Sequence, residues 1–208
     1  MKVLNLYACL GGNRLLWEDC EVTSVELDPE LARMYQERFP NDTVIVGDAH
    51  QYLLDHYKEF DFIWSSPPCP THSRARFWGS KGGQVAVKYP DLKLYEEIIL
   101  LENYFNGKWL VENVIPFYTP LIQPTKQLGK HSFWANFLIP EFKTESAHYE
   151  SQKEIEAFHK IDLSKYKGSQ SKKKVARNMV HYETGKHIFD LARGIYKANN
   201  SNQTALDL

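Results

Sequence analysis

Short runs of β-branched and aromatic residues alternate with helical patterns, and this alternation constrains the fold more than any other feature of the sequence. We expect strands at residues 3–7, 22–27, 43–46, 60–64 and 108–111, and helices at residues 15–20, 29–39, 52–57 and 92–104. Such an order predicts an α/β fold, with a mostly parallel sheet and helices on both faces. Ligands of such sheets bind beyond the carboxyl ends of the strands, so the informative residues should directly follow the strands.

The second part of the chain is less regular. Residues 132–139 are expected to form another strand, in an antiparallel hairpin at the edge of the sheet, whereas residues 140–170 are polar and weakly patterned. A helix is expected at residues 183–196, with Ile188, Leu191 and Ile195 on one face. With 208 residues and no internal repeat, the chain should form a single domain over residues 1–198, followed by a flexible tail at residues 199–208.

Composition excludes several classes of protein. The hydrophobic fraction of 43% and the charged fraction of 25% are ordinary for a globular chain. No apolar run could span a membrane and no signal-peptide h-region follows Met1, so we expect the protein to stay in the cytoplasm. Cys9, Cys20 and Cys69 lack paired spacing, which argues against a disulfide framework or a zinc site.

Three features at successive strand ends favour a ligand of the adenosine type. The glycine-containing turn at residues 7–13 follows the first expected strand and would let the backbone approach a ligand. Glu26 ends the second strand, where an acid commonly accepts hydrogen bonds from ribose hydroxyls. Asp48 ends the third strand and could accept from an exocyclic amine. Each acid alone is more often a helix cap, and no phosphate-binding lysine follows the glycines, which makes a nucleoside triphosphate a poorer candidate.

The fourth strand leads into a rigid turn that carries a cysteine. Residues 65–73 read Ser-Ser-Pro-Pro-Cys-Pro-Thr-His-Ser, and the prolines would hold Cys69 at the mouth of the ligand site. We expect the neighbouring His72, Arg74 and Arg76 to lower the pKa of the thiol and so favour the nucleophilic thiolate. The alternative is a buried structural cysteine.

The fifth strand leads into Val111-Glu112-Asn113-Val114. A carboxylate at Glu112 would face the same crevice as Cys69, one strand away, and could carry or share a proton there. The alternative is a glutamate that caps a neighbouring loop, and this segment alone does not separate the two interpretations.

Taken in order, these motifs resemble the cytosine-5 DNA methyltransferase family. The chain shows Leu-Tyr-Ala-Cys-Leu-Gly-Gly, then Glu-Leu-Asp-Pro, Gly-Asp, Pro-Pro-Cys and Glu-Asn-Val. The similarity runs from residue 2 to about residue 139 and resumes at Arg177-Asn178-Met179-Val180, which resembles the last motif of the family. Small bacteriophage members look most similar, and for them protection of phage DNA from host restriction is a plausible purpose.

The resemblance implies a Rossmann-like methyltransferase fold, S-adenosylmethionine as the cofactor, and methylation of carbon 5 of a cytosine flipped out of double-stranded DNA. Cys69 would attack carbon 6, Glu112 would hold N3 of the ring, and Asn113 would orient the loop that carries the cysteine. Arg74 and Arg76 complete the expected catalytic set. The expected cofactor-binding residues are Tyr7, Ala8, Leu10, Gly11, Gly12, Glu26, Leu27, Asp48, Ala49, Pro68, Asn178 and Val180. No metal is expected.

Three motifs depart from the family pattern. Cys9 replaces the first glycine of the cofactor loop, and Pro70 replaces the glutamine that usually follows the nucleophile. The arginine-rich motif of the family is represented at best by Lys130 and His131.

The chain also lacks the long target-recognition region of the family, since residues 140–176 are a short basic remnant in its place. DNA contact should then come from residues 70–90, which carry five basic side chains and no acid, and from the lysine-rich stretch after Ser164. Solvated loops are the ordinary alternative for both stretches. Phosphate contacts carry no sequence information, so we expect short or relaxed specificity, or a partner or second subunit that recognises the target.

Other functions remain open from the sequence. An enzyme of the same fold could methylate RNA, and a non-catalytic relative could bind only cofactor or DNA, although binding alone needs neither Cys69 nor Glu112. Methyltransferases that act on amines use an Asn/Asp-Pro-Pro-aromatic loop, where this chain has Ser-Pro-Pro-Cys. The spacing of Cys69 and His72 suits a metal site, but the sequence offers no second pair of ligands.

Overall fold

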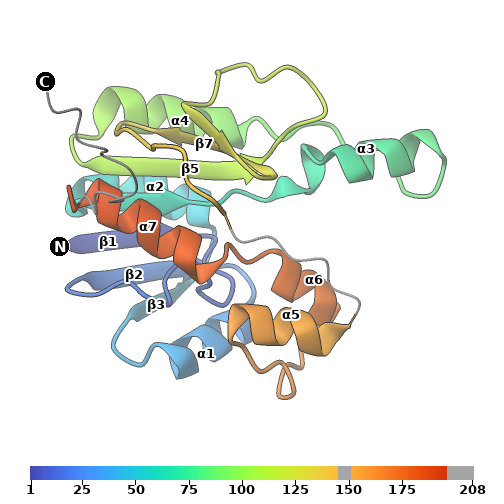
Figure 1. The fold of residues 1–208 in the computed structure, drawn as a ribbon, viewed down its shortest axis with the longest axis horizontal. Coiled ribbons are helices and arrows are strands. Elements are labelled where there is room, and N and C mark those ends of the chain that lie inside the picture. The colour runs from blue at the N-terminus through green and yellow to red at the C-terminus, as the bar shows by residue number, and fades with distance from the viewer. Residues whose placement is uncertain (145–150, 196–208) are drawn as a thin grey trace, which may run out of the picture.

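A computed structural model describes residues 1–144 and 151–195 and contains one seven-stranded sheet, with the strands in the order β3-β2-β1-β4-β5-β7-β6 (Figure 1). The strands are Lys2–Leu6 (β1), Glu21–Glu26 (β2), Thr43–Val46 (β3), Phe62–Ser65 (β4), Lys108–Val114 (β5), Lys126–Leu128 (β6) and His131–Ala135 (β7). The α-helices are Pro29–Arg38 (α1), Ala49–His56 (α2), Arg74–Lys81 (α3), Lys93–Tyr104 (α4), Gln152–His159 (α5), Lys172–Arg177 (α6) and Tyr182–Ala192 (α7). Two 3₁₀ turns are Tyr57–Glu59 (η1) and Cys69–Thr71 (η2).

The topology confirms the expected mostly parallel sheet. Strands β1 to β5 run parallel, and the hairpin of β6 and β7 adds an antiparallel edge through the pairing of β7 with β5. The direction in which strands are added reverses between β1 and β4, since β2 and β3 lie on one side of β1 and β5 on the other. Crevices at such a reversal are the usual ligand sites of open α/β sheets, so the loops after β1 and β4 are placed to form one.

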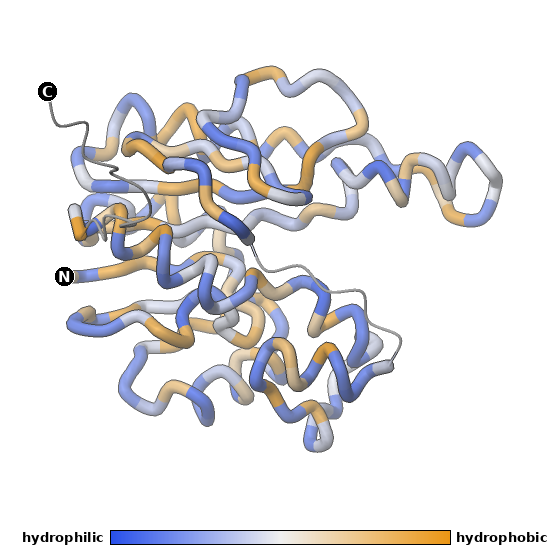
Figure 2. Tube along the Cα trace, viewed as in Figure 1, coloured by the Kyte–Doolittle hydropathy of each residue, from blue (hydrophilic) through white to orange (hydrophobic). Residues whose placement is uncertain are grey.

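Apolar side chains cover both faces of the sheet. On one face, Leu4, Leu6 and Ile63 pack with Leu53 of α2 and Ile98 of α4. On the other face, the core includes side chains from β1, β2, β4 and β5 together with residues of α7 and the hairpin; its aromatic members include Trp17, Phe62, Trp64 and Phe189. Figure 2 shows the corresponding hydrophobic stretches along the strands. Among the described helices, none has the length and apolar character that crossing a bilayer demands.

A third, smaller core lies where α5 and α6 meet α1. Residues 140–170, which the sequence analysis described as weakly patterned, therefore contain a helix with a buried face. Ile155 of α5 and Val175 of α6 are fully buried there with Leu31 of α1. Ser151 and Glu154 form a capping box at the start of α5, a signal that the sequence contains and that predicts a helix start. The basic remnant therefore folds against α1 and the loop after β1, while residues 145–150 lie outside the described residues.

Helix starts explain how the acids at the strand ends are held. Asp28 accepts a hydrogen bond from the backbone N–H of Glu30, and Pro29 occupies the first turn of α1. Asp48 caps α2 in the same way, which moves the start of this helix to Ala49, three residues before the expected position.

The expectation of a helix at residues 15–20 is wrong. This segment forms turns, because the carbonyl of Trp17 accepts from the Arg14 guanidinium at 2.7 Å and Asp19 adopts a left-handed backbone with φ of 54°. Trp17 instead turns into the core, where its ring stacks on Phe189 with centroids 4.9 Å apart, and its indole N–H donates to the carbonyl of Gly185 at 3.1 Å.

Helices α3 and α6 lie in basic stretches where no helix was expected, and other differences are shifts of boundaries. Pairing with β7 extends β5 to Val114, so Glu112 and Asn113 lie inside the strand. Strand β7 ends at Ala135, before the expected end at Ile139. Helix α7 ends at Ala192, and Ile195 follows it with 42% of its surface exposed. The expected tail at residues 199–208, and the last residues of the expected helix and domain, lie outside the described residues.

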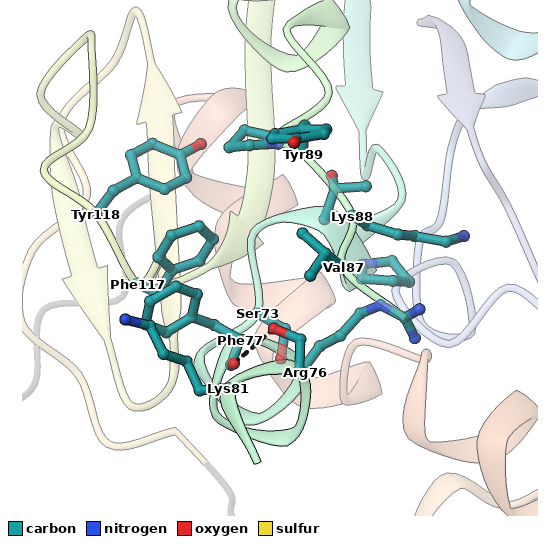
Figure 3. A pocket seen from close by; sticks show the side chains of 13 residues that line it. Ser73, Arg76, Phe77, Lys81, Val87, Lys88, Tyr89, Phe117 and Tyr118 are labelled. Carbon is teal, nitrogen blue, oxygen red and sulfur yellow. Dashed lines mark hydrogen bonds between the residues drawn. The ribbon is translucent and has the colours of Figure 1, made fainter. Parts of the chain in front are cut away.

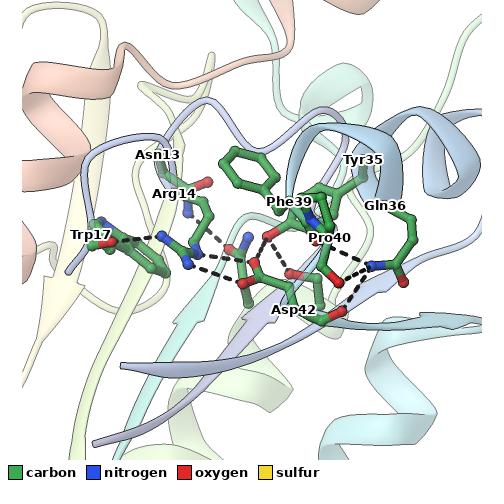
Figure 4. A network of polar contacts seen from close by, with 10 residues as sticks. Asn13, Arg14, Trp17, Tyr35, Gln36, Phe39, Pro40 and Asp42 are labelled. Carbon is green, nitrogen blue, oxygen red and sulfur yellow. Dashed lines mark hydrogen bonds and ion pairs between the residues drawn. The ribbon is translucent and has the colours of Figure 1, made fainter. Parts of the chain in front are cut away.

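A buried ion pair links the turn after β1 to the loop between α1 and β3. Figure 4 shows Arg14 reaching Asp42, and both Nε and Nη2 of Arg14 donate to the carboxylate at 2.9 Å. Asp42 also accepts from the hydroxyl of Tyr35 at 2.9 Å, and that hydroxyl accepts from Ser24 at 2.6 Å. Only 4% of the Asp42 side chain and 13% of the Arg14 side chain are exposed, so both charges are largely shielded from water.

We predict that Asp42→Ala lowers the free energy of unfolding by about 3 kcal/mol, because it leaves a mostly buried guanidinium and a buried hydroxyl without their acceptor. Urea denaturation followed by circular dichroism measures the change. Arg33→Ala is the matched control, since it breaks the exposed ion pairs with Glu30 and Glu37 on α1. Equal losses in the two variants would contradict the prediction.

Candidate active site

A pocket of about 430 Å³ opens at the carboxyl ends of β1, β2, β4 and β5. This volume falls in the range of small-molecule sites, roughly 300–1,000 Å³. Eleven of the predicted site residues line it. They are Tyr7, Glu26, Leu27, Asp48, Ala49, Pro68, Cys69, Glu112, Asn113, Asn178 and Val180. Segments that are far apart in the sequence therefore meet at the edge where the topology predicts a site.

One wall of the pocket carries the two acids. Both oxygens of Glu26 already accept backbone hydrogen bonds, from Cys9 at 2.8 Å and from Asp28 at 2.9 Å, and burial raises the pKa of Glu26. Asp48 uses Oδ1 to cap α2, while Oδ2 lies 3.7 Å from Nζ of Lys93. Each carboxylate retains lone pairs that can accept from a ligand in the pocket.

The loop after β1 has a strained backbone that Glu26 supports. Tyr7 and Cys9 adopt left-handed conformations, with φ of 57° and 47°. Such a backbone costs a residue other than glycine roughly 1–2 kcal/mol. The family pattern has a glycine where this chain has Cys9, and the left-handed backbone gives the physical reason. The hydrogen bond from the N–H of Cys9 to Glu26 holds the strained residue in place.

Four predicted cofactor residues in this loop do not line the pocket. Ala8 and Leu10 are buried, with 5% and 2% of their surface exposed. A Cβ on Gly11 would lie 2.5 Å from Phe39, and one on Gly12 would lie 2.4 Å from the carbonyl of Val180. The structure thus explains both glycines by close packing against neighbouring segments, and a direct contact of these four residues with a ligand stays a prediction.

Beneath the loop, a fully buried carboxylate joins four elements. Glu97 of α4 accepts from the hydroxyl of Tyr7 at 2.6 Å and from the hydroxyl of Ser65 at 2.5 Å, and it lies 3.0 Å from Nδ1 of His50 in α2. The hydrogen bond with Glu97 raises the pKa of His50, which favours the charged ring beside the carboxylate. This network fixes the base of the pocket where β1 and β4 end.

The opposite wall carries Cys69 at the start of the 3₁₀ turn η2. Asn113 in β5 donates from Nδ2 to the carbonyl of Pro67 at 3.0 Å, across the boundary between β5 and the loop after β4. Its Oδ1 accepts from the N–H of Val114 at 2.9 Å. The side chain of Asn113 is buried, and this contact is the one that a loop-orienting role requires.

The expectation that neighbouring cations lower the pKa of Cys69 is wrong. Burial, and next the negative charge of Glu112, raise the pKa of Cys69 to about 11. Arg74 donates to the carbonyl of Pro116 and Arg76 to that of Ala86, and neither arginine lines the pocket. Burial also lowers the pKa of His72, whose Nδ1 lies 2.5 Å from the hydroxyl of Tyr118. The resting site therefore holds a neutral thiol.

Glu112 itself is mostly buried, with 7% of its surface exposed. A basic side chain, His131 in β7, approaches it, with Nε2 3.7 Å from Oε1. His131 also lines the pocket. The sequence offered Lys130 and His131 as a weak basic motif, and the structure places the second of these beside Glu112.

Lysine-rich helix α6 and the turn after it close the pocket from the remaining side. Lys174, Arg177, Asn178 and Val180 all line it, and the charge of Lys174 is the one side-chain charge that opposes the rise in the pKa of Cys69. Part of the basic stretch that was expected to bind phosphates thus stands at the mouth of the site.

Several lining residues were not anticipated from the sequence, among them Leu31, Asp91, Lys93 and Leu94. A usable signal existed for Leu31, which lies in the first turn of α1 directly after the loop that follows β2, whereas Lys93 and Leu94 begin α4 after the return segment from α3. Across residues 1–144 and 151–195, no cluster of three or more His, Cys, Asp or Glu side chains could hold a metal ion.

Comparison with known proteins identifies a family. The model of the family described as C-5 cytosine-specific DNA methylase matches residues 1–120, more than half of the chain. The matched part includes the loop after β1, both acids, Cys69 and Glu112. No curated protein matches the chain.

Solved structures resemble the chain over part of its length. A putative methyltransferase, yhhF from Escherichia coli, is 17% identical with a TM-score of 0.42, over 64% of this chain and 73% of that chain. The PH0226 protein from Pyrococcus horikoshii is 23% identical with a TM-score of 0.38, over 54% and 49%. A DNMT2 mutant from Spodoptera frugiperda is 25% identical with a TM-score of 0.38, over 54% and 35%. The chain thus spans about half of the second protein and a third of the third.

We predict that Glu112→Gln speeds alkylation of Cys69 by iodoacetamide at pH 8. Removing the negative charge of Glu112 lowers the pKa of the thiol, and a fall of about half a unit would raise the thiolate fraction about threefold. Mass spectrometry of peptides separates Cys69 from Cys9, whose pKa burial raises to about 12, and from Cys20. Glu102→Gln on the exposed side of α4 is the matched control, and an unchanged rate in Glu112→Gln would refute the coupling.

Proposed function

The chain belongs to the C-5 cytosine-specific DNA methylase family, and from this premise we propose that it transfers a methyl group from S-adenosylmethionine to carbon 5 of a flipped cytosine in DNA. The observation that carries the proposal is the meeting of Cys69 and Glu112 in one pocket, opposite Glu26 and Asp48. Nucleophile and proton-handling carboxylate come from adjacent strands, and the acids that suit an adenosine come from β2 and β3.

The residues present fit the cofactor. Glu26 can accept from ribose hydroxyls and Asp48 from an amine, with lone pairs that their backbone contacts leave available. Leu27, Leu31 and Leu94 supply apolar surface in the same pocket for a flat ring. When bound, S-adenosylmethionine supplies an electrophilic methyl group to carbon 5 of the cytosine.

The coupling between Cys69 and Glu112 suggests how the nucleophile is activated. At pH 8 a thiol with a pKa of about 11 is only about 0.1% thiolate. A cytosine whose N3 shares a proton with Glu112 neutralises the charge that opposes the thiolate. Lys174 then remains as the nearby charge that favours it. In this mechanism the nucleophile becomes reactive when the base occupies the pocket, which limits side reactions of the resting enzyme.

The covalent steps then involve residues of this chain. The thiolate of Cys69 forms a bond to carbon 6, and the electron pair of the ring double bond makes carbon 5 nucleophilic, with N3 protonated against Glu112. After methylation, loss of the carbon-5 proton restores the double bond and expels the thiolate. Asn113 keeps the loop aligned with β5 through its bond to Pro67.

DNA contact in this proposal comes from basic side chains around the pocket mouth. Lys93, Lys174 and Arg177 line the pocket and can approach phosphates, and residues 70–90 add further cations. These contacts confer affinity without reading bases, so we propose double-stranded DNA as the substrate with short or relaxed specificity, or with a second subunit that recognises the target.

We predict that tritium from labelled S-adenosylmethionine appears in 5-methylcytosine of unmethylated DNA, and that Cys69→Ser lowers the rate by about a hundredfold or more. Nucleoside digestion and chromatography identify the product. Cys20→Ser is the matched control, because Cys20 is a half-buried thiol that does not line the pocket.

A second measurement traps the intermediate. DNA that contains 5-fluorocytosine should form an adduct with the wild type that survives a denaturing gel, since carbon 5 then has no proton to lose. Label in RNA but not in DNA would move the substrate to RNA and keep the chemistry. Cofactor binding without transfer to either nucleic acid would overturn the proposal as stated.

We further predict that Asp48→Asn weakens binding of S-adenosylmethionine about tenfold, because a hydrogen bond to a charged acceptor is lost while an amide oxygen can still cap α2. Isothermal titration calorimetry measures the affinity. Asp55→Asn alters an exposed acid of the same helix and should leave the affinity unchanged. Equal affinity in Asp48→Asn and wild type would remove Asp48 from the cofactor site.

A further inference from the structure

The pocket that holds Cys69 and Glu112 is called the reaction pocket from here on. A second pocket, of about 470 Å³, lies beside it and is called the side pocket. Both pockets include Pro70, the residue that follows Cys69. The side pocket lies between α3 with the segment that returns from it, on one side, and Phe117 and Tyr118 from the loop after β5, on the other (Figure 3). The two pockets therefore meet at Pro70, one residue from Cys69 along the chain.

Aromatic rings form much of the side pocket. Phe77 of α3 and Phe117 stack with centroids 4.1 Å apart and planes 4° from parallel, and Tyr118 meets Phe117 edge-on at 5.0 Å. Tyr89 is 85% exposed and Val87 is 66% exposed, although both line the pocket. Exposed apolar side chains that gather around one pocket, as these do, are typical of binding sites.

The charges around the rings have one sign. Arg76, Lys81 and Lys88 line the side pocket, and none of the described residues that line it is acidic. In Figure 3 the charged ends of Arg76 and Lys88 extend away from the group of rings, whereas Lys81 lies beside it. Nζ of Lys81 lies 5.5 Å from the centre of the Phe77 ring. The nearby carboxylate of Asp91 lines the reaction pocket instead.

The arm that carries these groups has a defined conformation. Helix α3 projects beyond the sheet in Figure 1, and hydrophobic and hydrophilic residues mix along it in Figure 2. Arg76 donates to the carbonyl of Ala86 at 3.2 Å, and the N–H of Gln84 donates to the carbonyl of Gly79 at 2.9 Å. These bonds tie the return segment to the helix, so the wall formed by Val87 and Tyr89 is held against α3.

Flat rings surrounded by cations match the chemistry of a nucleotide, whose base stacks on aromatic faces while its phosphate meets a positive charge. We propose that the side pocket binds the base of the nucleotide next to the target cytosine, so that the substrate is held with two adjacent bases out of the stack. The inference rests on the proposed function, because the neighbour is defined by the cytosine at Cys69. It deepens that function by favouring duplex DNA that is locally unpaired beside the target cytosine.

The test is the affinity of the cofactor-free protein for a labelled single-stranded oligonucleotide with one central cytosine, measured by fluorescence anisotropy at fixed salt. A matched oligonucleotide lacks the bases on both sides of the cytosine but keeps every phosphate. We expect the wild type to bind the second oligonucleotide about tenfold more weakly, the size of one lost stacking contact.

Phe77→Ala and Tyr89→Ala should bind both oligonucleotides with equal affinity, since the stacking surface is already reduced. Tyr89 is exposed, so its variant tests the pocket even where Phe77→Ala fails to fold. Tyr104→Ala is the matched control: Tyr104 is a 64% exposed tyrosine at the end of α4 outside the side pocket, and its variant should keep the tenfold difference.

Equal binding of the two oligonucleotides by the wild type would overturn the inference, as would a tenfold difference that survives in Tyr89→Ala and Phe77→Ala. Weaker binding caused only by replacing Lys81 and Lys88 would point to phosphate contact without a base and would also overturn it. A third oligonucleotide that lacks the central cytosine base separates this result from the proposed function. If the wild type bound this third oligonucleotide with unchanged affinity, the result would count against cytosine binding in the reaction pocket and not against base binding in the side pocket.

Discussion

The arrangement of the loops around the site depends most on the hydrogen bonds of the buried Glu97 side chain. This side chain joins the end of β1 through Tyr7, the end of β4 through Ser65, and helix α2 through His50, and it is fully buried. A buried charge is tolerated only when several donors surround it, and here the donors are the segments that shape the base of the pocket. The cost of burying Glu97 therefore selects one arrangement of the loops after β1 and β4.

The sheet and the candidate site residues at its edge could be predicted from the sequence. The spacing of apolar residues and the polar residues that follow each strand are local features, which a sequence shows directly. The strands β1 to β5 fall within one to three residues of their expected bounds, and the pocket gathers residues that followed those strands. Trp17 shows the limit: its segment has a helical pattern, but the chain turns there because Arg14 and Phe189 offer better partners. Cys69 shows a second limit, since sequence neighbours such as Arg74 and Arg76 point elsewhere while Glu112, from the next strand, sets the charge around the thiol.

The high pKa of Cys69 and its dependence on Glu112 suit the activation that we propose, in which the thiol becomes reactive when a base occupies the pocket. Burial protects it and a neighbouring carboxylate suppresses its ionisation. A strongly lowered pKa would give a more reactive resting enzyme that is also more easily oxidised. Because β4 and β5 are adjacent, Cys69 lies close enough to Glu112 for the carboxylate to keep the thiol protonated.

The closing wall of the pocket is built from residues that the ribosome adds long after the others. Tyr7, Glu26 and Asp48 are synthesised more than a hundred residues before Lys174, Asn178 and Val180, and Gly185 packs so tightly on Asn13 that a Cβ would lie 2.2 Å from its carbonyl oxygen. Contacts of such sequence separation form slowly. During translation, the emerging sheet consequently exposes the crevice that α6 later closes and the apolar side chains that α7 later covers, and a growing chain should need protection from aggregation until those helices leave the exit tunnel.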